Sequence, residues 1–539
     1  MATDKDKQGQ EQHAGGKRLS LELQEPPAPA WSDMGLGQKA KYVLANVTVE
    51  PITLMYIVPN LLSGLATLFL NLEKACRVNL NFPTELCDEF SVQNITNETQ
   101  AQYNQVTRLV AEMQVWQSPL QSAIPIVLVL FVGSYSDRRH RRKPFILLPL
   151  IGDLLMSVGL LLCSLFYLST PLEMAGIIEA IFPAFTGGMT ILFLSVFSYV
   201  ADISTVETRT FRIGMVATIV SWGLPAAIAL SGIAYETLGF VGVYAVSIVI
   251  YGVGLVYGLA RVKEPLPPVP RPPGTTFVAD FFNWRHVLET VKVALRRRPG
   301  TRQLQFFLVM VLYVTIQGPL QGESSVAFFF QTQQLKWGPI EQSGYGTYSV
   351  ILGAVGNFVV TTVLSRWLKL DDCVIGMLAM LAKTVAAPCY AFATEGWQMY
   401  AAAVTDIIGA GAVITMRAIA TKLVLSDELG KLLALLAVVE AIIPLVFKPV
   451  YSKVFAETSD TNVGFFFHIG GVISAVGFLV YLAIYLLQRK QARQEDAENA
   501  KKRDDENGGG GVDNTAFQGD GAAVRARGHN GNGVDNTFL

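Results

Sequence analysis

The sequence predicts an all-α polytopic membrane protein with about twelve transmembrane helices in two six-helix bundles. Hydrophobic residues make up 51% of the 539 residues and charged residues only 16%, whereas a soluble domain is about 25% charged. Apolar stretches of about 20 residues recur along the chain, and each is long enough to cross a bilayer core of about 30 Å. A proline-dense segment, 261–276, separates the first six of these stretches from the last six.

The recurring apolar stretches are predicted to be helices, because they are continuous and lack the alternating pattern of membrane barrel strands. Glycine and proline occur inside many of them, which membrane helices tolerate. The expected spans are 52–72, 116–136, 144–168, 174–200, 211–232, 238–260, 301–323, 342–365, 373–394, 397–421, 431–455 and 463–487.

Composition between and beyond the spans predicts the domain organisation. We expect a disordered cytoplasmic N-tail at 1–45, a first bundle at 46–260, a cytoplasmic linker at 261–300, a second bundle at 301–487 and a disordered cytoplasmic C-tail at 488–539. The start of the linker is rich in proline and should be extended. Its second part, 277–299, has an amphipathic pattern and is expected to lie as a helix along the inner membrane surface.

The distribution of basic residues predicts which side of the membrane each loop faces. With twelve spans, every basic segment falls on the same side as both chain ends, and the positive-inside rule makes that side cytoplasmic. These segments are 138–143, 296–298, Arg366 with Lys369, Lys422 with Lys431, and 489–503. We therefore expect a multi-pass integral protein of the plasma membrane or the lysosomal membrane, with both termini in the cytoplasm.

The first loop on the opposite side, 73–115, carries two signals of a non-cytoplasmic compartment. Asn94 and Asn97 each begin an Asn-x-Thr sequon, so both are predicted to be glycosylated. Cys76 and Cys87 lie in the same loop, where an oxidising compartment permits a disulfide. A bond between them is expected, and the alternatives are a pair of free thiols or a partner elsewhere in the chain.

Ionisable residues inside the predicted spans are the candidates for function. In hydrocarbon such groups cost a few kcal/mol, so they usually face a cavity or a partner. A rise of about 1.5 Å per residue places Lys383 about 16 Å from the inner edge and Asp406 about 14 Å from the outer edge of the next, antiparallel span. A Lys383–Asp406 pair is therefore feasible. The candidates are Glu179, Glu323, Lys383, Asp406, Arg417, Glu440 and Lys448.

Four of these groups are expected to bind an anionic substrate, namely Arg417, Lys383, Asp406 and Glu323. Arg417 has the geometry to hold a carboxylate or phosphate bidentately, and the alternative is that it only extends toward the inner surface. Lys383 and Asp406 could instead form a structural ion pair. Glu440 and Glu323 are the candidates for a coupling proton, because an apolar cavity favours a neutral carboxylic acid.

The stretch "GSYSDRRHRRKP" at 133–144 resembles a known motif. It follows the pattern G-x-x-x-D-R-x-G-R-R, which is the loop 2–3 signature of the major facilitator superfamily, with His140 in the place of the second glycine. The resemblance implies the two-bundle fold of that superfamily and a gate at the inner helix ends. The expected gating residues are Gly133, Asp137, Arg138, Arg141 and Arg142, joined by Asp202 and Arg209 from the end of span four.

Further segments resemble solute carrier family 46, whose best-known member is the proton-coupled folate transporter. They are "VADIS...RTFR" at 200–212, "QGE" at 321–323 and "VITMRA" at 413–418, and the similarity covers roughly 50 to 487. The resemblance implies that Arg417 matches an arginine of span ten that links proton and substrate. At the position of the folate transporter's proton-coupling glutamate, this chain has Ala217.

The function predicted from these features is secondary active transport of an organic anion, of the folate-like, muropeptide, nucleotide or steroid-conjugate class. Protons are the expected coupling ion, and alternating access is the expected mechanism. The alternative is a facilitative uniporter or exporter of an amphipathic molecule without proton coupling. A channel lacks support because the charges form no rings. An enzyme, a cofactor and a metal site lack support because no catalytic, zinc or phosphate-loop motif occurs. The net charge of −1 gives no reason to expect nucleic acid. No feature of the sequence predicts an oligomeric state.

Overall fold

The computed structural model describes residue 35 and the ranges 47–271, 276–282, 302–422 and 429–508, together with Gly274. All regular structure in these ranges is helical. The chain divides into two units, Met1–Tyr485 and Leu486–Leu539, and only the first holds the helix bundles. Most of the expected N-tail, the linker residues 283–301 and the end of the C-tail lie outside the described residues.

The first half of the chain forms the helices of one bundle. They are α3 (Glu50–Lys74), the π-helix η2 (Ala75–Asn79), α4 (Thr84–Ser91), α5 (Gln100–Arg139), α6 (Lys143–Leu165), the 3-10 helix η3 (Tyr167–Ser169), α7 (Leu172–Thr186), α8 (Gly188–Asp202) and α9 (Val206–Arg261). Helix α9 holds two spans, because Gly239 has a φ of 63° and a non-helical backbone. The short α10 (Phe277–Phe281) follows the proline-rich part of the linker.

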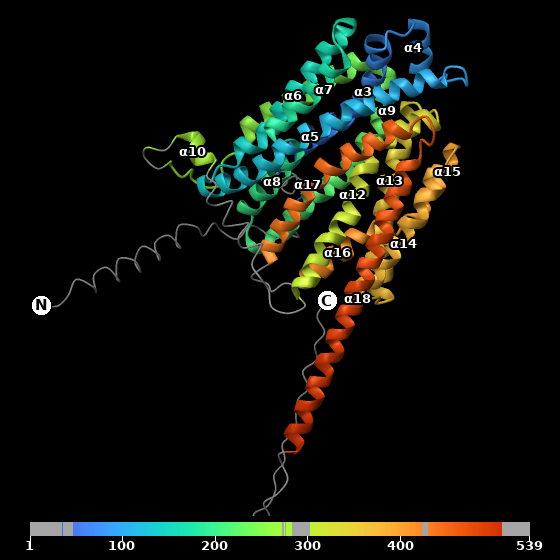
Figure 1. Cartoon of the computed structure of the whole chain (residues 1–539). Coiled ribbons are helices and arrows are strands. Elements are labelled where there is room, and N and C mark those ends of the chain that lie inside the picture. The colour runs from blue at the N-terminus through green and yellow to red at the C-terminus, as the bar shows by residue number, and fades with distance from the viewer. Residues whose placement is uncertain are drawn as a thin grey trace, which may run out of the picture. The chain divides into compact units, whose positions relative to one another are not determined.

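The second half forms a second bundle beside the first (Figure 1). Its helices are α12 (Arg302–Gln334), α13 (Pro339–Phe358), the π-helix η4 (Val359–Trp367), α14 (Asp372–Ala391), α15 (Gly396–Thr405), α16 (Gly411–Lys422), α17 (Leu429–Thr458) and α18 (Phe465–Gly508). The bundles meet where α5 packs against α17 and α9 packs against α13.

The helices account for the expected number of membrane spans. In the described residues, 8 segments are long and apolar enough to cross a bilayer. One of them is α9, which contains two spans. The remaining spans are α12, the broken pair α15 and α16, and α17, which completes six in each half. The expected all-α fold is therefore confirmed.

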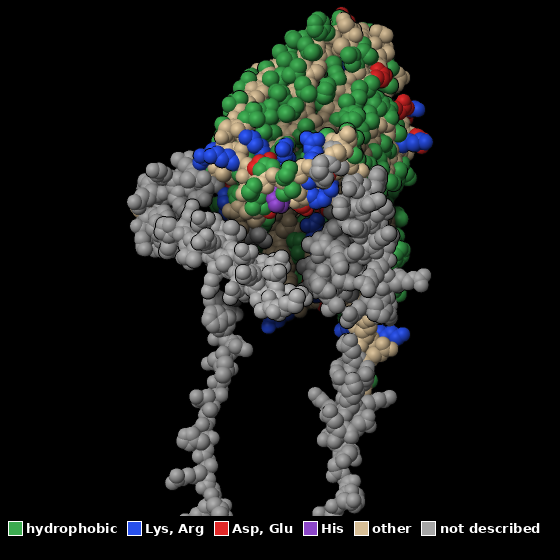
Figure 2. Space-filling view, turned by 90° about the vertical axis from the view of Figure 1, so that its left-hand side faces the viewer, with side chains coloured by type: hydrophobic (Ala, Val, Ile, Leu, Met, Phe, Trp, Pro, Cys, Tyr) green, Lys and Arg blue, Asp and Glu red, His purple; other side chains and the backbone are tan. Residues whose placement is uncertain are grey.

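Large apolar side chains are exposed along most of these helices. Figure 2 shows one face on which hydrophobic side chains dominate, with Lys and Arg gathered along its lower edge. A soluble protein rarely exposes so continuous an apolar surface, whereas a lipid bilayer covers it. This distribution is that of a membrane protein with a basic rim.

The prediction for the C-tail needs one correction. The tail was expected to be disordered from residue 488, but α18 continues to Gly508. The physical reason is composition, because residues 488–508 are rich in Gln, Arg, Ala, Glu and Lys, which are strong helix formers. The alternating charges that suggested disorder are equally compatible with a polar helix.

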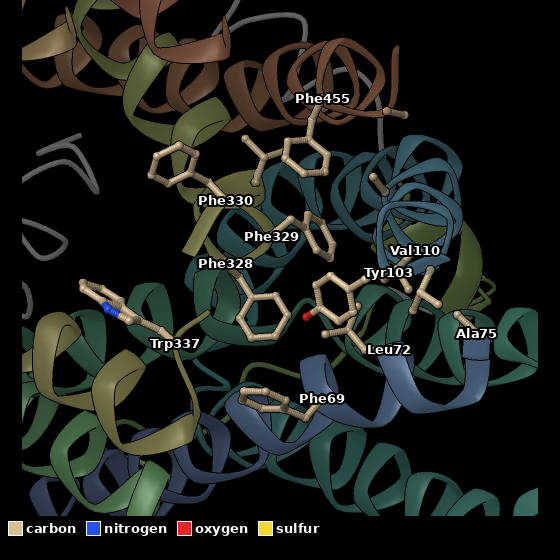
Figure 3. Packing of buried hydrophobic residues seen from close by; sticks show 14 of the residues in the cluster. Phe69, Leu72, Ala75, Tyr103, Val110, Phe328, Phe329, Phe330, Trp337 and Phe455 are labelled. Carbon is tan, nitrogen blue, oxygen red and sulfur yellow. The ribbon is translucent and has the colours of Figure 1, made fainter. Parts of the chain in front are cut away.

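Two ends of the bundles are distinguished from here on. The inner end carries the basic loop 138–143, and the outer end carries the loop 73–115. The largest hydrophobic cluster lies at the outer end and takes residues from both bundles. Phe69 of α3 meets Phe328 of α12 edge to face, with ring centroids 5.1 Å apart, as Figure 3 shows. The outer end is thus closed by packed aromatic side chains.

Polar contacts close the same end. Thr107 donates to Gln333 Oε1 at 3.1 Å, and Asn104 donates to Asp460 Oδ1 at 3.3 Å. Lys336 Nζ donates to the carbonyl oxygen of Ile95 in the outer loop. Hydrogen bonds that join two described residues across the bundles all lie in the outer half of the helices. The outer end of the bundles is therefore closed in this structure, and the inner end is the end that can open.

Candidate functional site

The basic loop at the inner end begins with an unusual backbone conformation. His140 caps the C-terminus of α5 with φ 51° and ψ 41°, in the left-handed region. Glycine adopts this conformation without steric cost and is the usual residue at such a helix end. The geometry therefore explains why the superfamily motif has glycine at the position that His140 occupies.

Arg142 is the centre of the loop's charge network. Its guanidinium pairs with Asp137 at 2.6 Å and with Asp202 at 2.8 Å. It also donates to Ser136 Oγ at 2.9 Å. Because Asp202 is the last residue of α8, this one arginine ties the end of span two to the end of span four. Charge-assisted bonds of this kind are about twice as strong as neutral ones.

A second clamp joins the same loop to the linker. Arg139 donates twice to the carboxylate of Asp280 in α10, at 2.7 and 2.8 Å. Arg138 donates to the backbone carbonyl of Asp280 at 2.9 Å. The hydrogen bonds from Arg139 hold the pKa of Asp280 below its ordinary value. Sequence analysis did not predict that Arg139 and Asp280 are partners. The feature that could have indicated this contact is the acidic residue in the amphipathic segment, which comes after the basic loop in the chain.

Two of the other expected gating residues, Gly133 and Arg141, make no comparable side-chain contact with the described residues. Gly133 lies within α5, where an added Cβ would meet only Leu194 at 3.8 Å. The side chain of Arg141 is exposed, and the carbonyl oxygen of Arg141 accepts from Ser136 Oγ at 2.7 Å. The side chain of Arg209 lies outside the described residues. The gating roles stay a prediction.

Span ten of the second bundle is interrupted in mid-membrane. Helix α15 ends at Thr405 and α16 begins at Gly411, with tight turns between them. Asp406 lies at the break and forms an ion pair with Lys383 of α14 at 3.1 Å. A Cβ at Gly409 would overlap the Asp406 carboxylate unless that side chain moved. The pair anticipated from helix rise is therefore formed, and it packs against the break.

Glu323 of α12 lies beside this pair. Glu323, Lys383 and Asp406 line one small cavity together with Tyr390. Its volume is about 20 Å³, which is room for about one water molecule. A pocket that holds a small-molecule substrate is about 300 Å³ or larger. In this state the three residues lie together, and the cavity between them is too small for a substrate.

Arg417 and Glu440 form a second pair nearer the inner end. Arg417 Nη2 lies 3.7 Å from Glu440 Oε2, and the side chains are 54% and 50% exposed. Arg417 belongs to α16 and Glu440 to α17. Tyr313 of α12 lies next to both. Both charged groups are therefore about half accessible to solvent and lie below the closed outer end.

Span four is interrupted like span ten. Helix α7 ends at Thr186 and α8 begins at Gly188; Gly187, between them, has a φ of 80°, and Gly188 has a φ of 50°. Each break lies in the fourth span of its bundle. Interrupted helices at corresponding positions of two repeats are a physical indicator of a transporter's binding site, because unwound backbone is tolerated only where it lines a cavity or is buried in protein.

Sequence analysis missed the acid beside the break in span four. Asp153 of α6 is fully buried. Its Oδ2 accepts from Asn60 at 3.1 Å and from Tyr251 at 3.4 Å. The preceding residue, Gly152, lies so close to Thr186 that a Cβ would overlap its side chain. The signal was present, because a lone acid near the middle of the expected span 144–168 needs a polar partner.

The outer loop has the covalent link expected from its cysteines. Cys76 and Cys87 form a disulfide with a Cα–Cα distance of 6.0 Å. Asn94 and Asn97 are both exposed, so each is accessible for the glycosylation predicted there. Within the described ranges, no group of His, Cys, Asp and Glu side chains could hold a metal ion.

Comparison with known proteins identifies the family. The Major Facilitator Superfamily model matches residues 111–447. A probable peptidoglycan muropeptide transporter of Drosophila melanogaster is 24% identical over 423 residues, covering 76% of this chain and 79% of that protein. The human lysosomal proton-coupled steroid conjugate and bile acid symporter SLC46A3 is 23% identical over 376 residues, covering 69% and 78%.

Solved structures give the same fold. The human organic anion transporter MFSD10 aligns with a TM-score of 0.52 at 14% identity, covering 80% of this chain and 98% of that one. A peptide transporter POT in complex with sulfate aligns with a TM-score of 0.51 at 14% identity, covering 81% and 94%. The chain therefore belongs to the major facilitator superfamily, a family of transporters and not of enzymes, and its resemblance to solute carrier family 46 is confirmed.

Proposed function

We propose that this protein is a proton-coupled symporter of an organic anion. The observation that carries the proposal is the Arg417–Glu440 pair, because both side chains are about half exposed below a closed outer end. An arginine accessible to solvent inside a transporter attracts anions. A carboxylate beside it competes with those anions for the same guanidinium.

The competition gives a simple coupling mechanism. While Glu440 is ionised, it neutralises Arg417 and disfavours a second anion there. A proton on Glu440 removes its charge, and Arg417 is then free to pair with a carboxylate, sulfate or phosphate of the substrate. The anion and the proton therefore bind together, as symport requires. Release of the proton restores the pair and displaces the substrate.

The buried cluster plays a different part in this proposal. Lys383, Asp406 and Glu323 surround a cavity with room for about one water molecule. The cluster contains two acids and one base, so one negative charge remains uncompensated within it when both acids are ionised. We assign Glu323 as a second group able to take a proton. Lys383 and Asp406 hold the break in span ten, where the backbone must rearrange as access changes.

The substrate class follows from the arginine and from the family. The muropeptide, steroid-conjugate, folate-like and nucleotide classes are all organic anions, and the relatives' printed names include the first two. The inner end faces the cytoplasm in this proposal, because it carries the basic loop. The loop 73–115 then faces the outside of the cell or the lysosomal lumen.

Flux measurements with purified protein test the proposal. In proteoliposomes, uptake of radiolabelled estrone sulfate, an anionic steroid conjugate, and of muramyl dipeptide, an anionic muropeptide, is measured with and without an inward proton gradient. We expect saturable uptake of at least one of them, accelerated by the gradient. Uptake that is saturable but indifferent to the gradient would instead favour the facilitative uniporter.

Two variants locate the site. Arg417→Ala should abolish gradient-driven uptake, because Arg417 is the cation that holds the anion in this proposal. Glu440→Gln should retain exchange of anion across the membrane but lose its pH dependence. Arg366→Ala is the matched control, because it removes another exposed arginine near the inner end. Normal gradient-driven uptake by Arg417→Ala would refute the anion site.

A further inference from the structure

Asp153 is a buried acid at the level of the membrane centre, and the function proposed above does not use it. It lies ten residues from Lys143, the inner start of α6, which is a rise of about 15 Å. The hydrocarbon core of a bilayer is about 30 Å thick. The side chain is fully buried, so its carboxyl group must find all its partners within the protein.

The groups that face this carboxyl group are uncharged. Asn60 of α3 donates to Asp153 Oδ2 at 3.1 Å, and Tyr251 of α9 donates to the same oxygen at 3.4 Å. Tyr56 of α3 is the third group that faces it, and its ring lies 6.2 Å from that of Tyr251. Asp153 Oδ1 is buried and has no hydrogen-bond partner in the described part of the chain. One oxygen of the carboxyl group therefore takes both hydrogen bonds, and the other takes none.

The second bundle has a charged residue at the corresponding place. Helix α6 is the third span of the first bundle, and α14 is the third span of the second. Lys383 lies eleven residues from the start of α14, as Asp153 lies ten residues from the start of α6. Lys383 has a carboxylate partner, Asp406, at 3.1 Å, whereas Asp153 forms no ion pair with a described residue. An ionised Asp153 would therefore be uncompensated at a level where Lys383 is compensated.

The break in span four touches the backbone beside Asp153. A Cβ on Gly152 would lie 2.0 Å from Thr186 Oγ1, so no side chain separates α6 from the last residue of α7. Across the break, a Cβ on Gly188 would lie 3.7 Å from the Tyr56 hydroxyl. A rearrangement of the break would therefore change the packing around the carboxyl group from two directions.

A neutral carboxylic acid suits these surroundings better than a carboxylate. A charge in an apolar interior needs a cation or a full set of hydrogen bonds, and Asp153 Oδ1 has neither. In the neutral acid, Oδ2 is the carbonyl oxygen that accepts from Asn60 and Tyr251, and Oδ1 carries the proton. Ionisation becomes favourable once water reaches Oδ1, because water hydrates the carboxylate.

We propose that Asp153 is protonated in this closed-outside state and is the proton-carrying group of the first bundle. When the break in span four rearranges and water enters from the inner end, the O–H bond at Oδ1 breaks and water accepts the proton. The carboxylate takes a proton again from water on the outer side. The protonated state rests on the geometry alone, whereas the part of Asp153 in coupling rests on the proposed function.

Infrared spectroscopy tests the protonated state without any substrate. The C=O stretch of a protonated carboxyl group is separate from the bands of carboxylates and amides. In the full-length protein in lipid vesicles at pH 7, Asp153→Asn should remove the intensity of about one carboxyl group from this band. Asparagine keeps the shape and the acceptor oxygen of the neutral acid, so the variant should fold. Glu236→Gln, at an exposed site of α9, is the control and should leave the band unchanged. An equal band in Asp153→Asn and the unaltered protein would overturn the proposal.

A second variant assigns the band to this site. Asn60→Ala removes the shorter of the two hydrogen bonds to Asp153 Oδ2. A carbonyl group that loses a hydrogen bond absorbs at higher frequency, so the part of the band that Asp153→Asn removes should move upward in Asn60→Ala. A band that does not move would show that it comes from another carboxyl group, and the protonated state of Asp153 would be overturned.

Equilibrium accumulation tests the coupling role separately. Proteoliposomes with a pH gradient of one unit and a membrane potential clamped at zero accumulate radiolabelled estrone sulfate until the gradient is balanced. Each coupled proton multiplies the final ratio of inside to outside concentration by about ten per pH unit. Asp153→Asn cannot carry its proton, so it should lower this ratio about tenfold. Because the ratio is an equilibrium quantity, a slower variant reaches the same value.

The outcomes separate the coupling role from the proposed function. An unchanged ratio in Asp153→Asn, or no uptake by this variant, would overturn the coupling role. If the unaltered protein transports neither estrone sulfate nor muramyl dipeptide, the proposed function and the coupling role both fail. The protonated state of Asp153 is still decided by the infrared band.

Discussion

Two ion pairs of the second bundle join the same kinds of group in different surroundings. Lys383 and Asp406 are 3.1 Å apart, and each side chain is 22% exposed. Arg417 and Glu440 are 3.7 Å apart, and the side chains are 54% and 50% exposed. The first pair packs against a helix break, and the second lies at the inner mouth. The exposed fractions of the side chains therefore differ more between the two pairs than the distances between their charged atoms do.

This difference separates a structural pair from an exchangeable one. Removing one partner of a buried pair leaves a charge without compensation, which costs about 3–5 kcal/mol. Removing one partner of an exposed pair costs about 0–1 kcal/mol, because water replaces the lost contact. An anion from solution can therefore compete for Arg417 at little cost. The same competition at Lys383 would require opening the packed break.

The largest effect on stability is expected from Asp406→Ala. This change leaves the Lys383 ammonium beside Glu323 but without its direct partner, and it removes a side chain that Gly409 closely contacts. The free energy of unfolding should fall by about 3 kcal/mol. Thermal unfolding of the purified full-length protein in detergent should show the loss as a lower Tm.

A double variant is the control for that measurement. Lys383→Met with Asp406→Leu removes both charges and keeps much of the volume, so it should recover most of the lost stability. If the double variant is as unstable as Asp406→Ala, packing at the break and not charge compensation sets the cost. The distinction between the two ion pairs would then need a different explanation.

The fold and the Lys383–Asp406 contact could be predicted from the sequence, because each depends on properties of one helix or of two consecutive helices. Apolar length identified the spans, and the rise per residue brought Lys383 level with Asp406. Arg139 and Asp280 were not predicted as partners, because the linker returns to the inner end of α5 through tertiary packing. The breaks in spans four and ten lie at close contacts, of Gly152 with Thr186 and of Gly409 with Asp406. The pattern of apolar residues in the sequence does not predict such contacts.

A third ion pair extends the comparison. It is buried, but it attaches only the short helix α10 to α5. Asp280 is 5% exposed and Arg139 is 10% exposed. Asp280→Asn should release α10 from α5 while the bundles remain folded. Hydrogen–deuterium exchange of residues 276–282 should therefore accelerate, whereas the Tm should change much less than in Asp406→Ala. Glu236→Gln, at an exposed site of α9, is the control.

The pH dependence of this clamp has a definite sign. Its hydrogen bonds to Arg139 lower the pKa of Asp280 in the folded state. The clamp therefore contributes its full stability above the ordinary aspartate pKa of about 3.9, and it is lost only as the pH falls through the lower folded value. Exchange protection of residues 276–282 should be the same at pH 7 and pH 5 after correction for intrinsic rates. Loss of protection at pH 5 would contradict this assignment.

The smallest effect on stability is expected from Glu440→Gln. Its partner Arg417 is 54% exposed, so water hydrates the guanidinium once the carboxylate is gone. The free energy of unfolding should change by less than about 1 kcal/mol. Thermal unfolding in detergent at low and high salt measures it, and added salt should reduce the difference from the wild type further. A loss as large as that of Asp406→Ala would show that the Arg417–Glu440 pair supports the fold. In that case a substrate anion could not displace Glu440 without destabilising the bundle, and the exchange mechanism would fail with it.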